Sequence, residues 1–163
     1  IFDIILKGSF PVWFGFEILG LEYNSWLIAL PAFASISGHN WSCFLKFKGG
    51  RGILVTIGIL IITTPLIFLL SSIIFITGWM FFRNTAVWVL YALCSVLIWS
   101  LILPHHSPIL IPIVCIILIV VKRLIPNLDP LPTHISKKRI YFNRLLNDRD
   151  IADRNLWISR TST

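Results

Sequence analysis

Apolar residues dominate the middle of the chain in long runs that carry no charge. No Asp, Glu, Lys or Arg stands between Arg51 and Arg83, or between Arg83 and Lys122. A water-soluble core has no need of such runs, whereas a bilayer interior penalises every ionised side chain and requires backbone groups to be paired within helices. The pattern predicts an all-α, polytopic membrane helix bundle.

Three apolar runs follow the basic segment near residue 50, at 53–82, 86–103 and 109–121. The first is too long for one span and holds Pro65 near its middle, where proline removes an amide donor and breaks or kinks a helix. We therefore expect a hairpin of two short spans, each about 18 Å long for roughly 12 helical residues. The number of crossings between the basic segment and Lys122 is then even.

The N-terminal part of the chain, before the basic segment, predicts shorter helices. Residues 1–7 are interpreted as the end of a helix whose beginning is missing, and Gly8 and Pro11 are expected to break it. Asp3 and Lys7 stand four apart and can pair on one face. Such a pair fits a buried structural contact at least as well as a place in a binding site. Two apolar segments follow, at 12–21 and 24–37.

The placement of charge sets the expected topology. The 163 residues are 56% hydrophobic and 13% charged with a net charge of +7, and nine of the 14 basic residues lie at or after Lys122. Basic segments that flank apolar spans normally stay on the cytoplasmic side, where they face anionic lipid. We therefore expect a transmembrane bundle at 1–125 with a cytoplasmic loop at 38–52, a basic cytoplasmic tail at 126–163, and no nucleic-acid partner.

Within that tail, Ile140, Leu145 and Leu146 are expected to line a helical face against the membrane. His105 and His106 lie between prolines in a turn on the opposite side and are interpreted as interfacial residues.

The strongest chemical signal is GHNWSCFLKFKGGRG at 38–52. Three glycines in four positions allow backbone N–H groups to converge on an anion, two cations add charge, and the following helix presents its positive end. The predicted phosphate-binding residues are Lys48, Gly49, Gly50, Arg51 and Gly52. The alternative is an ordinary basic loop with glycines at its turns. The nucleotide-binding pattern G-x-x-x-x-G-K-[ST] is absent from the sequence.

Other reactive residue types give weaker signals. Cys43, Cys94 and Cys115 are odd in number, widely spaced and close to apolar stretches. They are interpreted as small core residues rather than disulfide partners or metal ligands, and no metal or cofactor is predicted. His39 could accept a proton beside the loop, or could cap or brace it.

The run at 38–52 closely resembles the second signature of the PlsY-type glycerol-3-phosphate acyltransferases. The preceding DIILKGSFPV at 3–12 resembles the family's D-x-x-K-G-x-x-P-V stretch. The resemblance implies a seven-helix bundle in the cell inner membrane, its first helix missing from this chain, with the active site open to the cytoplasm. It also implies that the glycine loop grips the phosphate of glycerol 3-phosphate, with His39, Lys48 and Arg51 as the catalytic residues.

The family's third signature, approximately H-R-x-N-I-x-R-L-L with a following acidic residue, has its counterpart at 138–146. The corresponding residues are Lys138, Arg139, Tyr141, Arg144 and Asp150. Lys138 and Tyr141 stand where the family has His and Asn. In the second signature Ser42 replaces a usual proline and Val55 a usual threonine, and the family's first signature would precede Ile1.

The implied reaction transfers an acyl group from acyl phosphate to the primary hydroxyl of glycerol 3-phosphate, giving lysophosphatidic acid and inorganic phosphate. A basic loop at the interface would hold the phosphates, while grooves between apolar helices would hold the fatty tail. Two alternatives remain: a catalytically silent relative that binds phosphate or anionic lipid, and a small anion transporter.

Overall fold

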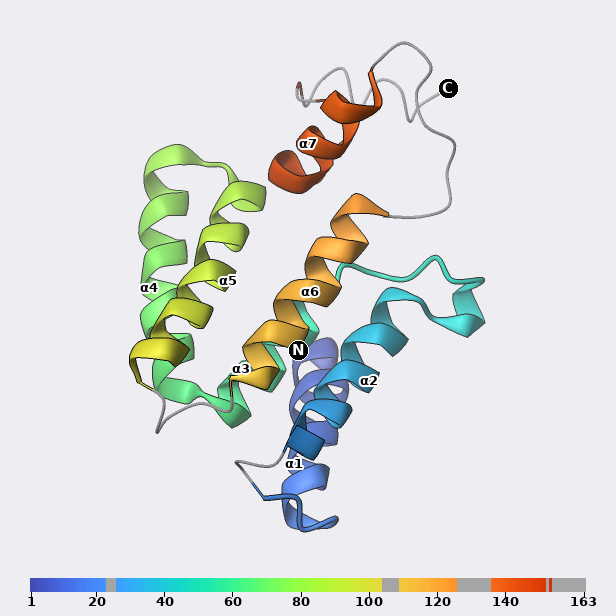
Figure 1. Cartoon of the computed structure of the whole chain (residues 1–163), viewed down its shortest axis with the longest axis vertical. Coiled ribbons are helices and arrows are strands. Elements are labelled where there is room, and N and C mark those ends of the chain that lie inside the picture. Colours follow the sequence, from blue (N-terminus) through green and yellow to red (C-terminus); the bar gives the residue numbers. More distant parts are fainter. Residues whose placement is uncertain (23–25, 104–108, 126–135, 152, 154–163) are drawn as a thin grey trace.

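The computed structural model describes residues 1–22, 26–103, 109–125, 136–151 and 153, and every regular element in these ranges is helical (Figure 1). In chain order the elements are η1 (Asp3–Ser9), α1 (Phe10–Glu17), η2 (Trp26–Ile28), α2 (Ala29–Asn40), η3 (Cys43–Leu45), α3 (Ile53–Thr63), α4 (Pro65–Phe82), α5 (Thr85–Ile102), α6 (Leu110–Leu124) and α7 (Lys137–Asn147). The predicted all-α bundle is confirmed.

The long apolar run is divided where proline predicted the break. α3 ends at Thr63, and α4 begins with Pro65 after Thr64 leaves the helical conformation at φ −145°. In Figure 1, α3 descends, α4 rises, α5 descends and α6 rises, which is an even number of passes. The expectation of two equally short halves was wrong, because α3 has 11 residues whereas α4 has 18.

α4 and α5 are the helices best suited to cross a bilayer. Each has 18 residues with a mean hydropathy of 2.1, and a helix of that length reaches about 27 Å. Many of their large apolar side chains point outward, as for Leu69 at 57% and Leu101 at 65% exposure. Outward apolar side chains are what a lipid environment favours.

The predicted break at Gly8 and Pro11 does not occur. η1 is a π-helix that continues directly into α1, with Pro11 in the first turn of α1. The last π-helical turn closes where the Phe10 amide donates to the Ile5 carbonyl. Pro11, which has no amide donor, therefore lies where the hydrogen bonds change from the π-helical to the α-helical pattern. Gly8 is kept for packing, because a Cβ there would meet the backbone of Gly58 in α3.

α2 runs further than the sequence pattern suggested. The helix continues to Asn40, and the Trp41 amide closes its last turn on the Ser37 carbonyl. His39 is therefore a helical residue and not a loop residue, and the connection to α3 begins at Trp41.

The main core joins α1, α2, α3 and α6. Its buried members are Val12, Ile28, Ala32, Ile36, Val55, Ile59, Ile111, Cys115 and Leu118. Of the three cysteines, only Cys115 is a core residue, whereas Cys43 and Cys94 are exposed. The interpretation of all three as core residues was therefore wrong, because Cys43 lies in a projecting turn and Cys94 on the outward side of α5.

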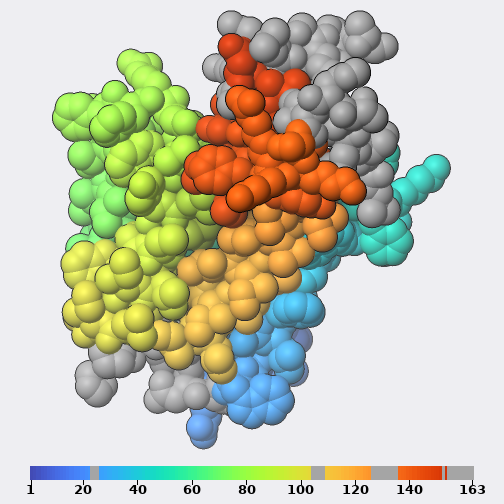
Figure 2. Space-filling view, turned by 45° about the horizontal axis from the view of Figure 1, so that its top comes forward, coloured from blue at the N-terminus to red at the C-terminus, as the bar shows by residue number. Residues whose placement is uncertain are grey.

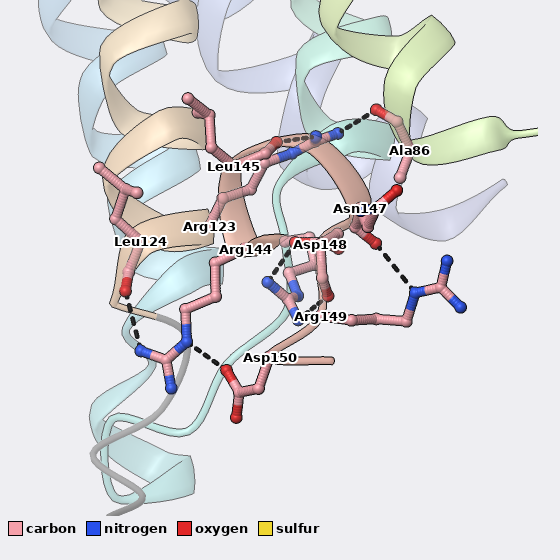
Figure 3. A network of polar contacts seen from close by, with 10 residues as sticks. Ala86, Arg123, Leu124, Arg144, Leu145, Asn147, Asp148, Arg149 and Asp150 are labelled. Atoms are coloured by element: carbon pink, nitrogen blue, oxygen red, sulfur yellow. Dashed lines mark hydrogen bonds and ion pairs between the residues drawn. The ribbon is translucent and has the colours of Figure 1, made fainter. Parts of the chain in front are cut away.

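α7 packs on the ends of α5 and α6. Arg123 donates to the carbonyls of Leu145 and Ala86, both at 2.9 Å, and Arg144 donates to the Leu124 carbonyl at 3.0 Å (Figure 3). Ile140 is fully buried against the bundle, so its expected contact with the membrane was wrong. The turn with His105 and His106 lies outside the described residues.

Candidate functional site: a basic loop between α2 and α3

The glycines of the loop allow it to lie directly on the end of α2. The Gly50 amide donates to the His39 carbonyl at 3.1 Å. A Cβ at Gly49 would overlap that carbonyl oxygen, and a Cβ at Gly50 would overlap Nε2 of His39. Of these three glycines only Gly52 has a positive φ, 74°, and it is the N-cap residue of α3. Two of the three glycines therefore serve close approach, and one serves conformation.

The loop amides divide into two groups. The amides of residues 45–48 donate to carbonyls of the same turn, and that of Gly50 donates to α2. None of these donors points to an external anion. The groups that remain suited to an anion are the loop cations and the N-terminus of α3, where first-turn amides have no acceptor within the helix and the dipole favours negative charge.

Arg51, one of the predicted catalytic residues, is held by an acidic group that the sequence analysis missed. Its Nη1 lies 2.5 Å from Oδ1 of Asp148, in the bend that follows α7. Burial raises the pKa of Asp148, and the nearby Arg51 and Arg123 oppose that rise. The loop is thus tied to the C-terminal segment by an ion pair that a phosphate group could exchange for the carboxylate.

Lys122 adds another buried cation to this end of the bundle. It is 1% exposed, its Nζ donates to the Asn40 carbonyl at 2.5 Å, and it lies 5.4 Å from the Trp41 ring centroid. Asn40 is fully buried, and its side-chain amide has no hydrogen-bond partner among the described residues. The sequence places Lys122 at the end of an apolar helix, and a charged residue in such a place indicates a functional position. Nothing in the sequence marks Asn40 as a site residue, apart from its place after His39.

His39 lies between η1 and the loop. Its Nδ1 is 3.8 Å from Oδ1 of Asp3, while its Nε2 side faces Gly50. Asp3 is also paired with Lys7 at 2.7 Å. The imidazole therefore lies between η1 and the loop and packs directly against Gly50.

The third-signature residues do not meet at the loop. Arg144 is paired with Asp150 and donates to the end of α6, so both act in docking α7 (Figure 3). Lys138 and Arg139 are exposed, as is Tyr141 at 43%. The contact between this segment and the loop is instead made by Asp148.

An apolar cavity of about 290 Å³ lies among α3, α4, α5 and α6. Its lining includes Ile53, Thr56, Phe68, Ser71, Ala92 and Ile119. Ile53 and Thr56 belong to the first turn of α3, directly after the loop. The space is close to the lower end of the usual range for ligand pockets, roughly 300–1,000 Å³. In the described part of the chain, no group of three or more His, Cys, Asp or Glu side chains could hold a metal ion.

Comparison with known proteins identifies relatives along the whole chain. Residues 1–131 match the family model described as glycerol-3-phosphate acyltransferase. The protein named glycerol-3-phosphate acyltransferase 4 of Dehalococcoides mccartyi strain CBDB1 is 28% identical, over 99% of this chain and 71% of its own length. Glycerol-3-phosphate acyltransferase 5 of strain ATCC BAA-2266 is 33% identical, over 99% of this chain and 70% of its own.

The fold also has solved counterparts. The crystal structure of PlsY, an integral membrane glycerol 3-phosphate acyltransferase, in its glycerol 3-phosphate form, superposes with a TM-score of 0.66 at 24% identity. The match covers 74% of this chain and 60% of that one, so the chain spans less than two thirds of the solved structure. With the family model matching most of the sequence, the chain belongs to the glycerol-3-phosphate acyltransferase family.

Proposed function

We propose that the protein transfers an acyl group from acyl phosphate to glycerol 3-phosphate at the cytoplasmic face of the cell inner membrane. The proposal rests on one observation, that the basic loop lies next to the apolar cavity. The loop that bears Lys48 and Arg51 leads directly into the first turn of α3, and that turn lines the apolar cavity. A phosphate held at the loop and a fatty tail held in the cavity would place the reacting carbonyl between them.

Each group has a defined role in this reaction. Lys48 and Arg51 hold phosphate at the N-terminus of α3, and Gly49, Gly50 and Gly52 shape the loop that brings them there. The primary hydroxyl oxygen of glycerol 3-phosphate attacks the acyl carbonyl carbon, and the bond from that carbon to the phosphate oxygen breaks. The bonding electrons leave with inorganic phosphate, and His39 takes the hydroxyl proton.

The chemistry needs little beyond positioning. Acyl phosphate is already activated, so neither a covalent serine nor a covalent cysteine intermediate is required. Alignment of the two substrates and neutralisation of their phosphates supply the rate. Asp148 holds Arg51 in the free protein, and the substrate phosphate takes its place.

The test uses membranes that contain the protein, supplied with acyl phosphate and labelled glycerol 3-phosphate. We expect lysophosphatidic acid and inorganic phosphate in equal amounts. Lys48→Ala and Arg51→Ala should each raise KM for glycerol 3-phosphate by about tenfold or more, because each removes a charge-assisted hydrogen bond of roughly 1.5–3 kcal/mol. Lys137→Ala, which removes an exposed cation on α7, is the matched control and should leave KM unchanged.

A catalytically silent relative is the second candidate, and one observation favours it. Lys138 and Tyr141, at the third-signature positions, are exposed on α7, while Arg144 and Asp150 hold each other. This candidate predicts that glycerol 3-phosphate raises the melting temperature of the wild-type protein but not of Arg51→Ala, while no lysophosphatidic acid forms from acyl phosphate or from another acyl donor.

A further inference from the structure

The turn formed by residues 43–48 exposes apolar side chains at the edge of the site. All of its residues are exposed, and Phe44 is the most exposed at 94%, with Leu45 and Phe47 each at 59%. Large apolar groups at this level of exposure gain nothing from the fold of the chain itself. Contiguous apolar groups of this kind mark a surface for a partner or a membrane.

The turn stands out sideways and not upward. In Figure 1 it projects laterally from the bundle, below the C-terminal end of α6. The space-filling view, tilted by 45°, shows the same segment extending beyond the outline of the molecule (Figure 2). Lipid surrounds the sides of a membrane bundle and water lies beyond its ends, so a sideways projection favours contact with lipid.

The backbone of the turn is prepared for a poorly hydrated environment. The amides of residues 45–48 donate to carbonyls of Ser42, Cys43 and Leu45, at 2.9 to 3.2 Å. Backbone donors satisfied in this way carry no large penalty at the boundary between headgroups and hydrocarbon.

The turn also maintains a costly conformation. Lys46 and Phe47 both have positive φ, 52° and 63°, a region that is unfavourable for residues other than glycine. In this conformation the side chains of Phe44 and Phe47 point outward, where the protein does not bury them. Strain of this kind is retained where the surroundings or a function require it.

The remaining side chains fit the same environment. Lys46 is exposed between Leu45 and Phe47, so a cation lies within the apolar group. An ammonium on a long apolar stem extends to the level of lipid phosphates while its stem stays among acyl chains. Anionic headgroups would attract it.

We propose that the 43–48 turn is an interfacial anchor. Phe44, Leu45 and Phe47 enter the leaflet beside the loop, and Lys46 binds the phosphates of anionic headgroups. The anchor holds the loop at the boundary between water and lipid. The proposal does not depend on the reaction, because it concerns the position of the turn in lipid.

The test measures depth in vesicles that contain the full chain. With Cys43→Ser and Cys94→Ser as background, a nitroxide is attached at Phe44→Cys, and at Lys46→Cys as the matched control within the same turn. Power saturation compares collision with oxygen, which concentrates in hydrocarbon, and with a nickel chelate, which stays in water. We expect the ratio of oxygen to nickel accessibility to be several-fold higher at position 44 than at position 46.

The lipid composition separates the two parts of the anchor. In vesicles of phosphatidylcholine mixed with anionic phosphatidylglycerol, the label at position 44 should lie deeper than in pure phosphatidylcholine, and Lys46→Gln should abolish that difference. Equal nickel accessibility at both positions would overturn the proposal. So would a label shielded from both reagents and broadened by a second label, which would show that another copy of the chain covers the turn.

Discussion

At the residue scale, the glycines of the loop show how one sequence feature can serve several physical needs. Gly52 supplies a positive φ at the N-terminus of α3, whereas Gly49 and Gly50 allow the loop to touch the end of α2. Spacing alone revealed the glycine cluster and its cations. It did not reveal that the Gly50 amide donates a hydrogen bond to the His39 carbonyl, because that contact depends on α2 continuing to Asn40.

A side chain at Gly49 should therefore destabilise the fold, whereas one at Gly38 should not. Gly49→Ala places a methyl group on the His39 carbonyl, a backbone atom that cannot rotate away. We expect the free energy of unfolding to fall by about 1–3 kcal/mol, as for other overpacked sites. Gly38→Ala adds a methyl group in open space on α2 and should stabilise by up to about 1 kcal/mol. Tryptophan fluorescence during thermal melting in detergent measures both, and equal melting temperatures would contradict the packing role.

The ion pair between Arg51 and Asp148 should respond to pH in a defined direction. Burial raises the pKa of Asp148 above its ordinary value of 3.8, so the folded protein binds this proton more tightly than the unfolded chain. Stability therefore falls as pH rises from about 3.8 through the folded pKa, and the cost is fully present above it. We expect Asp148→Asn to remove this component from the pH dependence of melting. A wild-type component of the opposite slope, absent from Asp148→Asn, would show that Arg51 outweighs burial.

At the element scale, the sequence pattern predicted the helices that contact lipid better than the segments that form the site. The break at Pro65 and the span of α5 follow from proline chemistry and uniform hydropathy, which are local properties. The continuation of η1 into α1 depends on Gly8 packing against Gly58, a tertiary contact that no local pattern contains. The docking of α7 through Arg123 is another such case. The exact third-signature contacts could not be predicted for the same reason.

The cavity among α3, α4, α5 and α6 offers a prediction about substrate length. Ala92 on α5 lines it, and Ala92→Phe places a ring in the space. If the cavity holds the acyl tail, kcat/KM should fall at least about tenfold for long-chain acyl phosphate, as expected when several methylene contacts worth roughly 0.8 kcal/mol each are lost. It should change little for a short-chain donor. Tyr91→Phe, one residue away and outward-facing, is the control. An equal fall in kcat/KM for donors of every acyl-chain length would mean that the acyl tail does not bind in this cavity.

At the scale of the whole molecule, the even number of passes brings together the parts that carry charge. The turn between α4 and α5, the end of α6 and α7 lie toward one end in Figure 1, the loop leaves the side of the bundle below the end of α6, and the end of α1 lies at the other end. Contacts link this end from distant parts of the chain, from Arg51 to Asp148 and from Arg123 to Ala86. Because basic segments next to membrane spans normally stay on the cytoplasmic side, we propose that this end faces the cytoplasm.

Accessibility to a membrane-impermeant maleimide tests this arrangement directly. In a chain whose cysteines are replaced by serine, single cysteines are placed at the exposed positions Arg83, Lys138 and Glu22. Arg83 and Lys138 are separated by two passes, α5 and α6, and Glu22 and Arg83 by three, α2, α3 and α4. We expect Arg83→Cys and Lys138→Cys to react only from the cytoplasmic side of oriented vesicles, and Glu22→Cys only from the other. Reaction of all three from one side would mean that α3, despite ending before Pro65, does not carry the chain across. The loop and the start of α4 would then share a face, and the cavity beside the loop could not receive an acyl tail from the cytoplasmic leaflet.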